Sequence, residues 1–101
     1  MPRRSEVALS DFRIFETAEF AKQFKKLPSR DASFLRRKLD SYVYPQIREE
    51  PFWGTNIKKL QGYSPDTWRY RIGRFRLFYV IDDEEKVLFI LTVDHRKDAY
   101  R

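Results

Sequence analysis

Three arginines alternate with apolar residues on either side of a short glycine turn in the second half of the chain. Gly73 and Arg74 suit the two central positions of a type II′ hairpin turn. With that turn, Arg71 lies opposite Arg76, and Arg69 lies on the same face, about 7 Å along its strand. Like charges directly opposite each other destabilise a strand pair, and guanidinium groups bind phosphate oxygens in pairs. The pattern predicts a phosphate site; alternatively, the arginines are solvated or paired with Asp and Glu from elsewhere in the fold.

The C-terminal segment 93–101 carries three further candidates for the same chemistry. His95 is the only histidine, and imidazole changes charge near neutral pH, so it is a candidate general base; alternatively, it is a partly exposed histidine at a strand end. Arg96 joins the arginines if a five-residue loop precedes this strand, whereas a four-residue loop moves it to the opposite face. Tyr100 either stacks on a nucleobase or covers an edge of the core.

Positive charge is concentrated around the same hairpin. The chain has 101 residues, with 21 Lys and Arg against 15 Asp and Glu, a formal net charge of +6. Residues 56–81 contain six of these bases and one acid, an excess of +5. Such a basic surface favours polyanionic partners, with nucleic acid first among them. The further residues that we expect to contact RNA or the ribosome are Lys22, Lys25, Lys26, Lys58, Lys59 and Arg74.

The composition excludes several other classes of function. The chain has no cysteine and one histidine, which leaves no disulfide framework and no zinc site built from thiolates and imidazoles. We expect no metal and no cofactor, and the lack of cysteine fits the reducing cytoplasm. No apolar stretch approaches the roughly 20 residues that a membrane-spanning helix needs. Residues 1–11 are expected to form a flexible extension, and residues 12–101 a single domain with one core.

The first half of the chain has the hydrophobic spacing of one strand and two helices. Phe12–Phe15 alternates as a strand does. Thr17 can cap a helix that Pro28 ends. The apolar residues that share a face of this first helix are Phe20, Phe24 and Leu27.

A second helix follows directly, so the two helices are expected to form a hairpin. Ser29 can cap it, and Pro45 is expected to end or kink it near Tyr44, because proline removes a backbone donor and clashes with the preceding turn. The apolar residues that line its predicted buried face are Ala32, Leu35, Leu39, Tyr42 and Val43.

From Asn56 onward the apolar spacing changes to two, which predicts strands. A short strand near Ile57 precedes a loop at 61–66, the hairpin, and an almost wholly apolar strand at 87–93, typical of a central strand covered on both faces. The fold class is therefore α+β: an N-terminal strand, a helical hairpin and a mostly antiparallel twisted sheet. The hairpin residues on the predicted core face are Trp68, Tyr70, Ile72, Phe75, Leu77, Tyr79 and Ile81.

Several segments together resemble the RelE branch of the RelE/ParE toxins. They are Lys58–Gly62, then Trp68–Tyr79 with the core R-Y-R-I-G-x-F-R-L-x-Y, and finally His95–Tyr100. The helix at 20–28, of the form F-x-K-x-F-K-K-L-P, resembles the family's opening helix. The resemblance covers roughly residues 12–101 in the family's order, and it implies the RelE-like fold of microbial ribonuclease type.

The resemblance implies a toxin of a type II toxin–antitoxin system that cuts mRNA in the ribosomal A site, by attack of the ribose 2′-OH on the adjacent phosphate. Arg76, Arg96 and Tyr100 fall on two arginines and a tyrosine of the family's motif. Arg69 and Arg71 fall on positions that are lysine in the best-known members. Arginine does not readily give up its proton, so a mechanism with lysine as the base does not transfer.

Three sources of the missing base remain open. His95 serves as the base, or Tyr100 assists by orienting the hydroxyl, or the ribosome and the mRNA supply most of the rate by positioning. Two other functions also remain open. ParE-like toxins share the fold and inhibit DNA gyrase without catalysis, although they generally lack the basic cluster on the sheet. The third reading is an inactive nucleic-acid-binding relative.

The resemblance also implies three partners: a cognate antitoxin, the ribosome and its mRNA. The antitoxin is expected to offer an acidic, amphipathic segment, because a cluster of arginines attracts carboxylates as it attracts RNA. We expect exposed aromatic residues to supply the apolar part of this contact, with Phe52 and Trp53 as candidates. The alternative is that both anchor the loop after the helices.

Overall fold

The computed structural model describes residues 11–95, so most of the expected N-terminal extension lies outside the described residues. In that part of the chain, no helix combines the length and the apolar character that crossing a membrane requires. The elements, in chain order, are β1 (Arg13–Glu16), α2 (Ala18–Lys25), α3 (Ser29–Lys38), the π-helical turn η1 (Leu39–Val43), α4 (Tyr44–Glu49), β2 (Ile57–Lys59), β3 (Trp68–Ile72), β4 (Phe75–Asp82) and β5 (Val87–His95).

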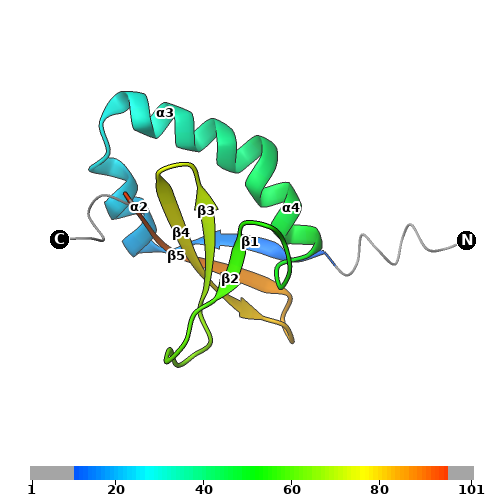
Figure 1. Cartoon of the computed structure of the whole chain (residues 1–101). Coiled ribbons are helices and arrows are strands. Elements are labelled where there is room, and N and C mark those ends of the chain that lie inside the picture. The colour runs from blue at the N-terminus through cyan, green and yellow to red at the C-terminus, as the bar shows by residue number, and fades with distance from the viewer. Residues whose placement is uncertain (1–10, 96–101) are drawn as a thin grey trace, which may run out of the picture.

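The strands form one sheet in the order β1-β5-β4-β3-β2 (Figure 1). Strands β5, β4, β3 and β2 pair antiparallel, and β1 pairs parallel with β5. The helices lie together on one face of this sheet (Figure 1). This arrangement confirms the predicted α+β class, with an N-terminal strand, a helical hairpin and a mostly antiparallel sheet.

The single core lies between the helices and one face of the sheet. Alternate strand residues enter it, so the hairpin contributes side chains from both β3 and β4. The predicted core face is confirmed, with Trp68 and Ile81 partly buried at its margins. The buried core residues are Phe12, Phe20, Leu35, Leu39, Val43, Tyr44, Ile47, Tyr70, Ile72, Phe75, Leu77, Tyr79, Leu88, Ile90 and Val93.

The opposite side of the sheet, which we call the outer face, is not covered by any helix of the described residues. The prediction that β5 is covered on both faces is therefore wrong. Its apolar run continues because Phe89 packs edge-on against Phe15 of β1, with ring centroids 5.7 Å apart. From the register, the outer face comprises Arg13, Phe15, Lys58, Arg69, Arg71, Arg76, Phe78, Val80, Asp82, Val87, Phe89, Thr92 and Asp94.

The second helix differs from its prediction in three respects. It begins at Ser29 with Pro28 in the cap position, so Ser29 is not the cap. Of the two outcomes expected at Pro45, an end or a kink, the first is wrong, because the helix continues as α4; an irregularity does precede Pro45, the turn η1, where the Tyr44 amide donates to Leu39 O five residues back. The wider turn changes the phase of the helix, so Tyr44 is buried while Tyr42 is 53% exposed, contrary to its predicted place in the core.

Strands β4 and β5 contain a β-bulge that sets which side chains of β5 face outward. Asp82 pairs with Val87 across a four-residue turn, but the register shifts between Tyr79 and Phe78, whose partners are Ile90 and Thr92. Leu91 is thus left over between the two partners on β5. An extra residue of this kind exchanges the two faces of the strand beyond it.

Thr17 joins this bulge to the start of α2. Its Oγ1 accepts a hydrogen bond from Phe20 N at 3.2 Å, which confirms the predicted helix cap. The same hydroxyl donates toward Ile90 O at 2.7 Å and Leu91 O at 3.1 Å, and its own amide donates to Ile90 O at 3.1 Å. One side chain therefore satisfies both an unpaired helix amide and the carbonyls of the bulge.

A polar network fastens β1 to the long helix on the core side. Glu16 accepts hydrogen bonds from Tyr44 Oη at 2.6 Å and Arg36 Nη1 at 3.0 Å, and Arg36 also pairs with Asp40 at 3.2 Å. Burial, together with the neighbouring Glu16 carboxylate, raises the pKa of the Tyr44 hydroxyl above its ordinary value. The tyrosine therefore stays a neutral donor that holds Glu16 in place.

Replacing Thr17 by valine removes the hydroxyl without changing the side chain's shape. We expect Thr17→Val to lower the free energy of unfolding by about 1–2 kcal/mol, because the helix amide and the bulge carbonyls both lose a partner. Urea unfolding at constant m-value measures the loss. Thr17→Ser keeps the hydroxyl and should restore most of the stability; a valine variant as stable as the parent would contradict the dual role.

Candidate functional site

The hairpin that carries the arginines has the predicted register. Arg71 pairs with Arg76, and Arg69 with Phe78, so all three guanidinium groups start from the outer face. Gly73 has φ +59°, and the only non-glycine residue with positive φ among the described residues is Lys86. This is the pattern of a type II′ turn, which needs positive φ at its first central position only.

One of the three arginines has an acidic partner. Arg76 Nε and Nη2 lie 3.3 and 3.2 Å from Asp94 Oδ1, directly across the β4–β5 pair. The guanidinium carbon of Arg76 also lies 5.8 Å from the centre of the Phe78 ring. The side chain of Arg76 is 24% exposed, and that of Asp94 is 40% exposed. The carboxylate and the ring hold Arg76 in one place on the outer face.

Arg69 is the least satisfied of the three. Its Nε is buried and has no hydrogen-bond partner. Burial, and then the positive charges of Arg71 and Arg76, lower the pKa of the Arg69 guanidinium below its usual value. Lys58 of β2 stands opposite Arg69 and adds a further positive charge to the same face. A buried donor among like charges is stabilised by an anion that binds between them.

The C-terminal end of β5 faces the arginines, as expected with a five-residue loop, but it does so for a different reason. The loop before it has four residues, which alone would have turned the C-terminal segment to the core side. The bulge at Leu91 reverses the alternation, so Thr92 and Asp94 face outward opposite Phe78 and Arg76. Arg96 and Tyr100 lie outside the described residues, so their places relative to this cluster stay predictions.

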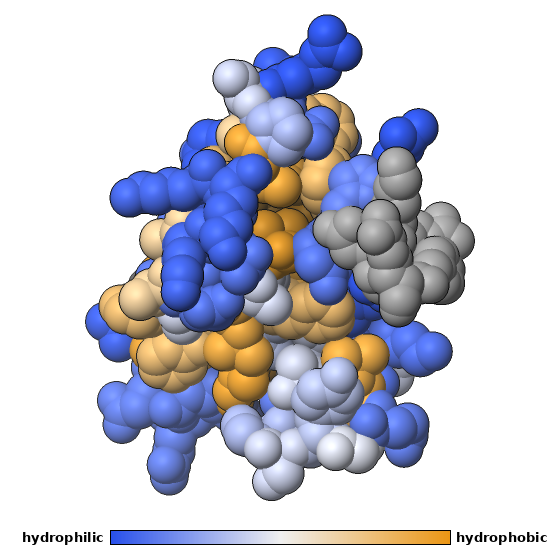
Figure 2. All heavy atoms as spheres, turned by 90° about the vertical axis from the view of Figure 1, so that its left-hand side faces the viewer, coloured by the Kyte–Doolittle hydropathy of each residue, from blue (hydrophilic) through white to orange (hydrophobic). Residues whose placement is uncertain are grey.

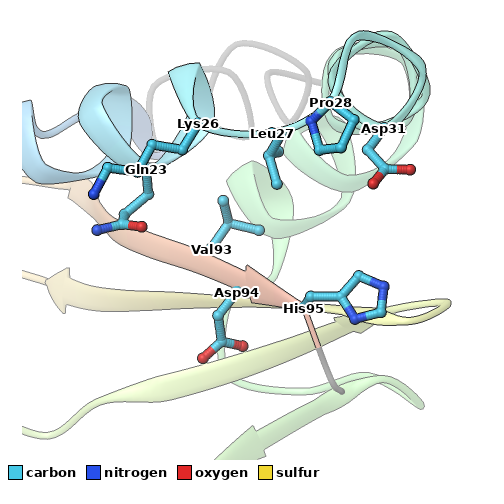
Figure 3. Close-up of a pocket in the computed structure, with 8 residues that line it drawn as sticks. All are labelled: Gln23, Lys26, Leu27, Pro28, Asp31, Val93, Asp94 and His95. Atoms are coloured by element: carbon cyan, nitrogen blue, oxygen red, sulfur yellow. The ribbon is translucent and has the colours of Figure 1, made fainter. Parts of the chain in front are cut away.

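His95 is not brought together with the arginines. It pairs with Phe75 at the end of β5, with ring centroids 5.0 Å apart, on the core side of the sheet. Figure 3 shows Val93 and Asp94 pointing to opposite sides of β5, with Val93 directed toward Leu27. Within the described part of the chain, Asp94 thus lies on the same face of the sheet as the arginines, and His95 lies on the other face.

His95 lines a cleft between the first two helices and the end of β5. The cleft has a volume of about 420 Å³. The side of the molecule where α2 lies shows hydrophilic side chains around a strip of hydrophobic ones (Figure 2). The residues that line the cleft are Gln23, Lys26, Leu27, Pro28, Asp31, Val93, Asp94 and His95.

The other predicted contacts for RNA or the ribosome are spread over three regions. Lys58 lies on the outer face, whereas Lys59 points to the other side, pairs with Asp66 at 3.3 Å and lies 6.0 Å from the Trp68 ring. Arg74 is exposed at the hairpin turn. The lysines of the helical hairpin are exposed around α2, with Lys26 beside the cleft: Lys22, Lys25 and Lys26.

Asp94 is the functional candidate that sequence reasoning did not select. The five-residue loop considered from the sequence does put Thr92 and Asp94 on the side of Arg76, but the structure reaches that arrangement through a four-residue turn and a bulge, which the apolar pattern does not reveal. In residues 11–95, no group of three or more His, Asp or Glu side chains could hold a metal ion.

A family model described as the ParE toxin of type II toxin–antitoxin system, parDE, matches residues 14–100. Among curated proteins, RelE1, a candidate toxin of Methanocaldococcus jannaschii, is 30% identical over 80 residues. That alignment covers 79% of this chain and 84% of the archaeal protein. Sequence similarity therefore spans the hairpin, the arginines and most of the remaining fold.

Two solved structures share the fold over most of its length. The toxin–antitoxin complex RelBE2 of Mycobacterium tuberculosis matches with a TM-score of 0.66 and 29% identity, over 85% of this chain and 99% of the other. The E. coli RelBE toxin–antitoxin complex matches with a TM-score of 0.61 and 27% identity, over 83% and 95% of the two chains.

The repulsion between opposed arginines should be measurable in the protein alone. We expect Arg71→Gln to raise the free energy of unfolding by a few tenths to about 1 kcal/mol, because it removes a like charge facing Arg76. Chemical denaturation at low ionic strength measures the gain, which should shrink as salt screens the charges. Arg37→Gln, at an exposed position on α3, should change stability less; a destabilised Arg71→Gln variant would show that this arginine has a partner in the fold.

Proposed function

Because this chain belongs to the RelE branch of the RelE/ParE superfamily and is a toxin of a type II toxin–antitoxin system, we propose that it is a ribosome-dependent endoribonuclease. In this proposal it enters the A site and cleaves mRNA by attack of a ribose 2′-OH on the adjacent phosphate. The observation that carries the proposal is the buried, unpartnered Nε of Arg69 beside Arg71 and Arg76. That arrangement favours a bound anion, and phosphate is an anion that guanidinium groups bind through paired hydrogen bonds.

The positions of the arginines support different roles for Arg76 and for the pair Arg69 and Arg71. Arg76 is held by Asp94 and Phe78, so it is best suited to stabilise the charge that develops on the phosphorane. Arg69 and Arg71 are two strand residues apart, about 7 Å, which is close to the spacing of successive phosphates. They would hold the backbone beside the scissile bond. Arg96 and Tyr100 enter this scheme through the family resemblance.

The ribosome would supply positioning. No helix of the described residues covers the outer face, and its arginines cannot select one bond of a flexible RNA by themselves. Holding the codon in an in-line geometry can contribute several kcal/mol to a reaction of this kind. This explains why we expect cleavage of mRNA on translating ribosomes and little cleavage of free RNA.

The test is primer extension on mRNA from translating ribosomes incubated with the purified protein. Cuts between nucleotides of A-site codons support the proposal. Intact mRNA together with inhibition of DNA supercoiling by gyrase would establish a ParE-like inhibitor instead. Intact mRNA and unaffected gyrase would leave a nucleic-acid-binding protein without catalysis, and would equally refute the proposal.

Truncating Arg76 should reduce activity far more than stability. We expect Arg76→Ala to lower the single-turnover rate on ribosomes by about 10²–10³-fold, the typical loss for a donor to a developing oxyanion. Its ion pair with Asp94 is partly exposed, so unfolding free energy should fall by less than about 1 kcal/mol. Arg37→Ala, an exposed arginine on α3, is the charge-matched control. Parental cleavage by Arg76→Ala would remove this arginine from the mechanism.

Similar toxins are found in complexes with antitoxins, and a cognate antitoxin is the partner of this chain. We propose that an acidic, amphipathic segment of it covers the outer face. Carboxylates would lie over the arginines, and apolar side chains over Phe15, which is 54% exposed beside Phe89. Of the earlier candidates, Phe52 packs edge-on against Trp68 with centroids 5.5 Å apart, while Trp53 is 75% exposed.

Because the acidic segment would cover the arginines of the outer face, antitoxin binding and RNA binding should compete. We expect the affinity for the antitoxin to fall with increasing salt, and ribosome-dependent cleavage to stop once the complex forms. The complex should also melt at a higher temperature than the toxin alone, since a ligand of the folded state stabilises it. Titration calorimetry at several salt concentrations, with the cleavage assay in parallel, provides the check. A salt-indifferent complex that still cleaves mRNA would disprove electrostatic masking.

A further inference from the structure

The proposed reaction lacks an assigned base. Its arginines are poor proton acceptors, because a guanidinium group carries donors and no acceptor. His95 stands on the core side of the sheet, against Phe75. The 2′-OH is adjacent to the scissile phosphate, so a base for it must lie beside the groups that bind that phosphate.

Asp94 occupies that position. It is opposite Arg76 in the register, and its Oδ1 lies 3.3 and 3.2 Å from Arg76 Nε and Nη2. Its side chain is 40% exposed, so substrate can reach it from the open face. The other acidic residue on the outer face in the described strands is Asp82, at the far end of β4, where it accepts a bond from Glu85 N.

We propose that Asp94 is the general base of this site, an inference that rests on the proposed ribonuclease function. A carboxylate oxygen of Asp94 takes the proton of the 2′-OH. The 2′-oxygen forms a bond to phosphorus while the bond from phosphorus to the 5′-oxygen breaks, and the departing 5′-oxygen takes a proton from water. The products are a 2′,3′-cyclic phosphate and a 5′-hydroxyl, and Asp94 returns its proton to solvent.

The pairing with Arg76 explains how a weak base can act here. A guanidinium has donors on more than one edge, so Arg76 can hold Asp94 through Nε and Nη2 and still offer Nη1 to a phosphate oxygen. The substrate phosphate then sets the distance between ribose and carboxylate. Positioned acid–base groups contribute about 10²–10⁴-fold to rate.

The first experiment compares Asp94→Asn with Asp82→Asn, a matched control on the same face. The asparagine oxygen can still accept from Arg76, so the fold and the arginine remain in place. We expect Asp94→Asn to slow single-turnover cleavage on ribosomes by at least 100-fold, with equal or tighter ribosome binding because a negative charge is lost. Asp82→Asn should cleave at the parental rate, and Asp94→Glu should recover part of the activity.

A modified mRNA separates the base from other roles. Replacing the 5′-bridging oxygen at the cleaved bond by sulfur provides a leaving group that needs no proton. If Asp94 is the base, Asp94→Asn stays slow on this mRNA; recovery of the parental rate would make Asp94 an acid and overturn the inference. A loss of ribosome binding in step with the loss of rate would also overturn it, by showing that Asp94 only positions Arg76.

Two further outcomes distinguish this inference from the function on which it rests. Parental cleavage by Asp94→Asn, with a large loss in His95→Gln, would assign the base to the histidine and leave the ribonuclease function intact. Absence of any cleavage by the unmodified protein would refute the ribonuclease function, and the role of Asp94 with it.

Discussion

The contact on which the outer face depends is the opposition of Arg71 and Arg76 across the β3–β4 hairpin. In residues 11–95 the helices cover one side of the sheet only, and alternation sends every second hairpin side chain away from the core. Tyr70, Leu77 and Tyr79 anchor one side in the core. The other side carries like charges that repel each other, and the free energy gained by burying the core residues offsets this repulsion. The surface is therefore prepared for an anion before any partner arrives.

In the proposed function, this one surface serves two opposing partners. RNA and an acidic antitoxin segment both offer negative charge, and the field of Arg69, Arg71 and Arg76 attracts both. They differ in what else they bring: RNA offers a 2′-OH beside each phosphate, whereas a peptide offers apolar side chains for Phe15 and Phe89. Asp94 repels the phosphates of RNA and the carboxylates of a peptide alike, and under the proposed mechanism only RNA brings a 2′-OH whose proton it can accept. The balance between toxicity and neutralisation thus depends on few side chains.

The sequence predicted local features better than distant pairings. The hairpin register followed from the glycine turn and a strict alternation, and the Thr17 cap from residue type and spacing. The buried face of the second helix was wrong at Tyr42, because a π-helical turn changes its phase. The Arg76–Asp94 pair was not predicted because its register depends on the bulge, and the Glu16–Tyr44 bond was not predicted because it joins β1 to a distant helix. Such contacts depend on how strands are aligned in space.

The bulge at Leu91 has a consequence for how this surface can change over evolutionary time. Asp94 and His95 are neighbours in the chain, yet they stand on opposite sides of β5, and one unpaired residue upstream decides which is which. If β5 paired continuously through Leu91 without the bulge, Asp94 would turn to the core side, and Val93 and His95 would lie on the outer face. Thr17, at the start of α2, stabilises the bulge because its hydroxyl donates to the carbonyls of Ile90 and Leu91. A change that abolishes the bulge would therefore remove the carboxylate from the outer face while leaving Arg69, Arg71 and Arg76 in place.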